Sequence, residues 1–76
     1  MNKKEKLLGR ITNNNKGVRF SDLQKILEWD GWEISSQTSS HYTYSKQGVG
    51  RVTIVRKADG MAKPYYVKVV LKLMGC

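Results

Sequence analysis

His41 is the residue of this chain with the clearest capacity for chemistry near neutral pH. It is the only histidine among 76 residues. Imidazole, whose ordinary pKa is about 6.5, can both accept and donate a proton in that range. A lone histidine on a strand is at least as often a solvent-facing structural residue as a catalytic one. The residues around His41 must therefore decide between these two interpretations.

Basic residues are concentrated in the half of the chain that contains His41. The 14 Lys and Arg outnumber the 6 Asp and Glu and give a net charge of +8. Residues 1–33 hold seven bases and five acids, whereas residues 34–76 hold seven bases and only Asp59. Such an excess favours a polyanionic partner, nucleic acid above all, although each cation could also be an ordinary solvated charge. The candidates for phosphate contact are Lys46, Arg51, Arg56, Lys57, Lys63, Lys68 and Lys72.

No sequence pattern indicates metal, cofactor or membrane chemistry. Cys76 is the only cysteine, so it has no partner in the chain for a disulfide or a multi-cysteine zinc site. The sequence has no glycine-rich phosphate loop and no nucleophile triad. Its apolar runs fall short of the ~20 residues of a membrane span, and the basic start lacks the apolar run of a secretory signal. We expect no cofactor, no metal, no membrane contact and a location in the reducing cytoplasm.

A short helix is predicted over about residues 3–12. Asn2 and Glu5 have the spacing of a capping box, and a narrow apolar stripe follows them: Leu7, Leu8 and Ile11. The Asn- and Gly-containing residues 13–17 break this pattern. We expect residues 1–17 to form a helical extension in front of a domain of residues 18–76.

A second helix follows. Ser21 and Gln24 repeat the capping-box spacing, and Gly31 supplies a left-handed residue that can end the helix. One face carries Leu23, Ile26 and Leu27. Trp29 lies at the edge of that face, and the sequence does not decide whether it packs inside or stacks on a ligand.

From Trp32 onward the apolar residues alternate, which predicts three short strands, the last two joined by a hairpin through residues 46–50. One face of the sheet should lie against the helices and carries Trp32, Ile34, Tyr42, Tyr44, Val52 and Ile54. The opposite face should be open to water or a partner and carries Glu33, His41, Thr43, Arg51 and Thr53.

The last predicted element is a helix over Pro64–Met74, with Pro64 in its first turn and an apolar stripe through Tyr66, Val69, Val70 and Leu73. Tyr65 lies off this stripe and should be exposed. The predicted fold class is α+β: a short helix, then an α-β-β-β-α domain with a three-stranded antiparallel sheet and helices on one face. This order is that of double-stranded RNA-binding domains.

The ordered set of these segments resembles the HicA toxin family. The segments that carry the resemblance are Val18–Leu23, Asp30–Glu33, Ser39–Tyr44, Val52–Ile54 and Gly60–Val67. The resemblance implies a fold like that of RNA-binding domains and cleavage of messenger RNA. It also implies neutralisation by a HicB-type antitoxin protein encoded beside the toxin.

The family motif Gly-Ser-His on the second strand matches Ser39-Ser40-His41, and its histidine is the catalytic residue. His41 is therefore the implied catalytic residue and Ser40 a possible supporting one, while Ser39 replaces the usual glycine. The third strand of many members ends Thr-Ile-Pro-x-His, where this chain has Lys57 in place of the second histidine. Lys57 can offer positive charge there, but it cannot exchange protons near neutral pH.

Three hypotheses follow for the function. The first is a metal-independent endoribonuclease toxin that uses His41 as general acid and base, because cleavage of RNA without metal needs a base for the 2′-hydroxyl proton and cations beside the phosphorus. The second is an RNA-binding module without catalysis. The third is a degenerate toxin that only binds its antitoxin.

Overall fold

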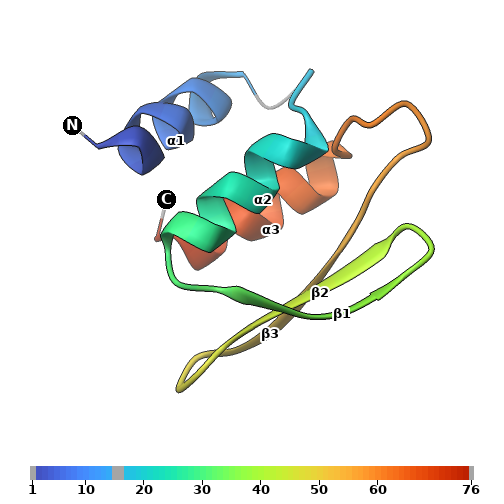
Figure 1. Cartoon of the computed structure of the whole chain (residues 1–76). Helices are drawn as coiled ribbons and strands as arrows, with labels where there is room; N and C mark the ends of the chain where they lie inside the picture. The colour runs from blue at the N-terminus through green and yellow to red at the C-terminus, as the bar shows by residue number, and fades with distance from the viewer. Residues whose placement is uncertain (1, 15–16, 76) are drawn as a thin grey trace.

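A computed structural model of the chain describes residues 2–14 and 17–75, so the predictions about Cys76 and residues 15 and 16 lie outside the described residues. Along the chain the elements are α1 (Lys3–Asn13), α2 (Phe20–Trp29), β1 (Glu33–Thr38), β2 (His41–Lys46), β3 (Gly50–Val55) and α3 (Pro64–Leu73). The helices lie on one side of the sheet, with α2 and α3 next to it and α1 farther away (Figure 1). The predicted α+β class is confirmed.

β2 is the middle strand of the sheet. The spatial order is β1-β2-β3, and both pairs are antiparallel. The hairpin between β2 and β3 closes at the pair Lys46–Gly50, as predicted. Consecutive hairpins therefore place His41, the first residue of β2, between the two outer strands.

α1 forms where its capping residues predict it. The Asn2 side chain accepts a hydrogen bond from the Glu5 backbone N–H at 2.8 Å. Leu8 and Ile11 are buried and join the same core cluster as residues of α2 and the sheet. The helix ends one residue later than predicted, at Asn13. The division between an extension and a domain at residue 17 stays a prediction.

The predicted start of α2 was wrong. The helix begins at Phe20 with Arg19 as N-cap, so Ser21 lies within its first turn. The Asp22 carboxylate, rather than a serine hydroxyl, accepts a hydrogen bond, from the Arg19 backbone N–H at 3.3 Å. The earlier start buries Phe20, whose ring centroid lies 4.8 Å from that of Tyr42 on β2. Burial of an aromatic ring thus outweighs the capping preference of Ser21.

The predicted faces of the sheet hold for β2 and β3. Tyr44, Val52 and Ile54 are buried against the helices, as is Trp32 just before β1, and Tyr42 is half-buried. The prediction for Ile34 was wrong, because its side chain is 49% exposed. Ile34 lies opposite Tyr44 on the outer strand β1, immediately before an irregularity in the register. Such a bulge turns an outer strand away from the core.

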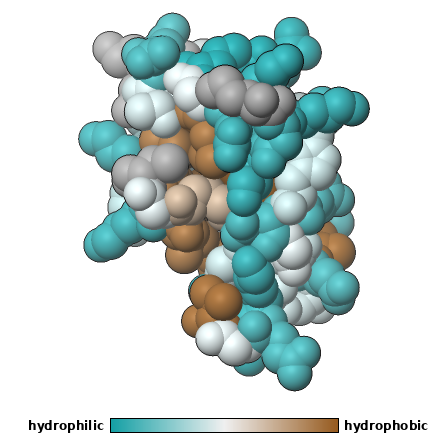
Figure 2. All heavy atoms as spheres, turned by 90° about the vertical axis from the view of Figure 1, so that its left-hand side faces the viewer, coloured by the Kyte–Doolittle hydropathy of each residue, from teal (hydrophilic) through white to brown (hydrophobic). Residues whose placement is uncertain are grey.

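α3 begins at Pro64 as predicted, but its buried stripe is rotated from the predicted one. Val67 and Val70 are fully buried, Tyr66 and Val69 are partly buried, and Leu73 is exposed. The face of the molecule that Figure 2 shows is mostly hydrophilic, and its hydrophobic side chains gather in a few smaller areas. The core therefore lies between the helices and the inner face of the sheet.

Candidate functional site

His41 lies on the sheet face that points away from the helices. It opens β2, opposite Thr38 of β1 and Val55 of β3. Its neighbour Tyr42 packs toward Phe20 and the helices, and successive side chains of a strand point to opposite faces. The His41 side chain is exposed, as predicted. A ligand can therefore reach the imidazole directly from solvent.

The turn before His41 has a backbone conformation that favours glycine at its first position. Ser39 and Ser40 connect the paired residues Thr38 and His41. Ser39 has a φ of 54°, and it is the one non-glycine position with positive φ in the described part of the chain. A two-residue hairpin loop with positive φ only at its first position is of type II′, in which glycine is favoured. Ser39 adopts this conformation at a cost of about 1 kcal/mol.

A row of polar side chains continues from His41 along the outer face of the sheet. We call this the His41 face and define it by His41, Thr43, Ser45, Arg51 and Thr53, which the strand pairing places on one side. The Thr43 and Thr53 hydroxyl oxygens lie 3.0 Å apart across the strands. This short hydrogen bond fixes the middle of the face, while the His41 imidazole and Arg51 at its two ends are exposed.

The loop after β3 borders the His41 end of this face. The Arg56 backbone N–H donates to the Ser40 carbonyl at 2.8 Å, and Arg56 also pairs with Ala62. Lys57 is two residues beyond Val55, the partner of His41 on β3. Its ammonium lies 3.7 Å from the Asp59 carboxylate. Lys57 therefore brings positive charge to this end of the sheet, and the exposed Asp59 is its counterion.

The other predicted phosphate contacts do not gather around His41. Arg51 is on the His41 face and Arg56 is exposed beside its end. Lys63, Lys68 and Lys72 belong to α3 or its N-cap, on the helix side of the sheet. Lys46 points to the helix side as well, since its ammonium meets Asp30 at 3.2 Å. All these assignments as RNA contacts stay predictions.

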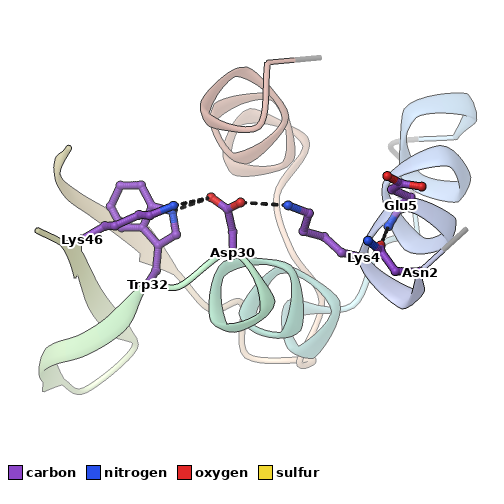
Figure 3. A network of polar contacts seen from close by, with 6 residues as sticks. All are labelled: Asn2, Lys4, Glu5, Asp30, Trp32 and Lys46. Carbon is purple, nitrogen blue, oxygen red and sulfur yellow. Dashed lines mark hydrogen bonds and ion pairs between the residues drawn. The ribbon is translucent and has the colours of Figure 1, made fainter. Parts of the chain in front are cut away.

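Asp30 joins three segments at the far end of the core from the Ser39 turn. Its carboxylate receives hydrogen bonds from the Lys4 ammonium at 2.8 Å, and from the Lys46 ammonium and the Trp32 indole N–H at 3.2 Å each (Figure 3). The Lys4 hydrogen bond is the main cause that lowers the pKa of Asp30, and it outweighs the opposing effect of partial burial. This cluster holds α1, the end of α2 and β2 together, and no spacing in the sequence indicates it.

A second polar contact crosses the layers at Tyr44. The Gln24 amide donates to the buried Tyr44 hydroxyl at 3.1 Å. Burial raises the pKa of Tyr44, so its side chain remains a neutral phenol within the core. Tyr44 thus anchors the middle strand to α2 and contributes no chemistry to the His41 face.

Residues 2–14 and 17–75 contain neither a cluster of metal ligands nor a helix that could span a membrane. No group of three His, Cys, Asp or Glu side chains in these ranges is placed to hold a metal ion. None of the helices in these ranges combines the length and apolarity that crossing a membrane requires. The acid–base group that the His41 face offers is the imidazole itself.

Comparison with known proteins gives one family. A model described as the HicA toxin of bacterial toxin–antitoxin systems matches residues 20–76, which include α2, the whole sheet and α3. No significant match was found among curated proteins or among solved structures. The matched region contains Ser40, His41 and the complete His41 face. Because the match covers most of the chain, the protein belongs to the HicA toxin family.

Proposed function

We propose that the chain is an endoribonuclease toxin that cleaves messenger RNA without a metal, with His41 as the general acid and base. The observation that carries this proposal is the exposed imidazole on the middle strand, at one end of an open polar face, within the region that matches the HicA family. The excess of positive charge supports a polyanionic substrate.

The proposed reaction is a transfer within the RNA chain. Neutral His41 takes the proton of a ribose 2′-hydroxyl, and the 2′-oxygen attacks the adjacent phosphorus. The bond from phosphorus to the 5′-oxygen breaks, which leaves a 2′,3′-cyclic phosphate and a 5′-hydroxyl. The departing 5′-oxygen takes the proton that His41 accepted, so this single histidine acts first as the base and then as the acid. General base catalysis of this kind contributes about 100- to 10,000-fold to a rate.

Cations near His41 would offset the charge that develops on the phosphate oxygens. Arg56 is joined to Ser40 through its backbone, and its exposed guanidinium lies beside Gly60 in the loop that borders the His41 face. Lys57 carries a second positive charge on this loop, which Asp59 beside its ammonium partly offsets. Arg51 lies at the other end of the His41 face, where it would hold a neighbouring phosphate.

The partner that would control this activity is an acidic antitoxin of the HicB type. The exposed polar His41 face and the net charge of +8 fit an acidic protein that covers His41. Charge complementarity would chiefly raise the association rate and the selectivity of this complex. The direct test is copurification with the product of the neighbouring gene. A complex in which His41 remains fully accessible would contradict inhibition by blocking.

Induced expression in a bacterium tests the toxin activity itself. The wild-type chain should arrest growth and deplete messenger RNA, and His41→Ala should do neither. Ser45→Ala is the matched control, because it removes another polar group from the His41 face without touching an acid–base residue. Arrest by both variants would place the chemistry outside His41.

The degenerate toxin is the second candidate, and one observation favours it. Lys57 stands where many members have their second histidine, and it is paired with Asp59. A purified chain that binds the antitoxin but leaves RNA intact over long incubation would support this candidate. RNA binding without cleavage and without any antitoxin would support the binding module instead.

A further inference from the structure

An open groove of about 790 Å³ runs along the line between α1 and α2. The two helices are antiparallel, since Lys4 contacts Asp30 at one end and Arg10 contacts Asp22 toward the other. α1 is the layer farthest from the sheet (Figure 1). The groove is therefore separated from the His41 face by the helix layer and the sheet.

The lining of this groove is strongly basic. It contains one carboxylate, Asp22, and five cations: Lys3, Lys6, Arg10, Arg19 and Lys25. Asp22 is already engaged, because it accepts hydrogen bonds from the Arg10 guanidinium at 3.2 Å and from a backbone N–H. Lys3, Lys6 and Lys25 are exposed and form no ion pair within residues 2–14 and 17–75. Their charge is available to an anionic ligand.

The cations of α1 follow the length of the groove. Lys3, Lys6 and Arg10 are spaced three and four residues apart, so they lie along one side of the helix. Their backbone positions are separated by about 4.5 and 6 Å along the helix axis. Such a row suits successive charges of an extended polyanion better than a single small anion.

An aromatic ring is exposed at the same groove. Trp29, the last residue of α2, lines the groove and is 45% exposed. The other tryptophan, Trp32, is buried and its N–H is bonded to Asp30. Exposed aromatic rings beside rows of cations are the usual means of binding single-stranded nucleic acid, in which bases stack and phosphates meet the cations.

The apolar lining is too deeply buried to hold a partner helix. Ile11 is 1% exposed and Val18 is 4% exposed. Helix-in-groove binding needs several accessible apolar pockets, whereas this groove offers chiefly Trp29 and part of Leu7.

We propose that the groove between α1 and α2 is a second RNA-binding surface, at which Trp29 stacks on a base of a single strand and Lys3, Lys6 and Lys25 contact its phosphates. The choice of RNA as the polyanion rests on the proposed function, but the site does not require His41.

The first test measures binding of a fluorescent single-stranded oligouridylate of about ten nucleotides to the full chain carrying His41→Ala. Lys3→Gln/Lys6→Gln is compared with Lys3→Arg/Lys6→Arg, which keeps the charge at the same exposed positions of α1. The glutamine variant should lose about tenfold in affinity, and its slope of log affinity against log salt should fall by about 1.4. The arginine variant should lose less than about threefold. Equal losses would overturn the proposal.

The second test isolates the ring. Trp29→Leu should weaken oligouridylate binding at least about fivefold, whereas Trp29→Phe should retain most of it, because phenylalanine keeps a stacking surface. If both variants and the parent bind oligouridylate with equal affinity, the proposal is overturned. A polyglutamate peptide serves as a second polyanion. Groove variants that lose binding of this peptide but keep binding of RNA would also overturn the proposal. Cleavage by the wild-type chain is scored separately. Failure of the His41 mechanism and failure of the groove are therefore distinguishable.

Discussion

The Arg56 backbone N–H donates a hydrogen bond of 2.8 Å to the Ser40 carbonyl. This bond ties the turn between β1 and β2 to the chain that leaves β3. His41 lies between these two segments, as the residue after Ser40 and the partner of Val55. The position of the imidazole is thus set by the backbone of all three strands, while its side chain stays open to solvent.

Ser39→Gly should stabilise the protein by about 1 kcal/mol, because it removes the cost of a left-handed side chain. The gain will be reduced by the greater chain entropy of glycine in the unfolded state. Urea denaturation of both proteins measures the difference. Ser40→Gly is the control, since its φ is not positive and it should destabilise. A Ser39→Gly protein less stable than wild type would contradict the strain at this turn.

The strands could be predicted from the sequence where one face of the strand is buried against the helices and the other is exposed to solvent. Tyr44, Val52 and Ile54 are inside because β2 and β3 lie across the core. Ile34 follows the same alternation, yet β1 is an outer strand with an irregular register, so the alternation alone does not bury it. For α2, the local capping pattern at Ser21 gave the wrong start, because burial of Phe20 decided it.

The candidate site could be predicted only in part. The alternation of β2 placed His41 outside, and the family motif singled it out. Contacts between distant residues were not predictable, because sequence periodicity carries no information on them. Asp30 binds Lys4 and Lys46 from 26 and 16 positions away, and this pairing holds the Lys46 ammonium on the helix side of the sheet.

Asp30→Asn should destabilise the protein by about 1 kcal/mol near neutral pH, because two ammonium groups lose their counterion. The pKa of Asp30 is lowered in the folded state, chiefly by the Lys4 hydrogen bond. Its contribution is therefore fully present above the unfolded-state pKa of about 3.9 and is lost as the pH falls through the folded-state value. The difference in free energy of unfolding between wild type and Asp30→Asn should shrink below about pH 4.

Asp59→Asn is the matched control for this pH dependence. Asp59 also pairs with a lysine, at 3.7 Å, but its side chain is 58% exposed. Removing its charge should change the free energy of unfolding by less than about 0.5 kcal/mol. Denaturation curves at several pH values compare the three proteins. A constant difference for Asp30→Asn from neutral pH into acid would contradict a role for its charge.

Removal of divalent metal should leave RNA cleavage unchanged. The proposed reaction uses the His41 imidazole and nearby cations, and no described group of three His, Cys, Asp or Glu is placed to hold a metal ion. Purified chain is incubated with labelled RNA in the presence and absence of a chelator. Loss of cleavage in chelator, followed by recovery on addition of magnesium, would show that a metal takes part.

His41→Ala should abolish RNA cleavage and growth arrest while the fold and antitoxin binding persist. An exposed strand side chain contributes little to packing, so the free energy of unfolding should change by about 0.5 kcal/mol or less. Loss of the general base should instead lower the cleavage rate by about 100- to 10,000-fold. Thermal melts, cleavage rates and antitoxin titrations on the same preparations separate the two effects, with Thr53→Ala as a control for loss of a polar contact on the same face. A His41→Ala protein that melts far below wild type would make His41 structural, and one that melts normally and still cleaves RNA would place the acid–base group elsewhere.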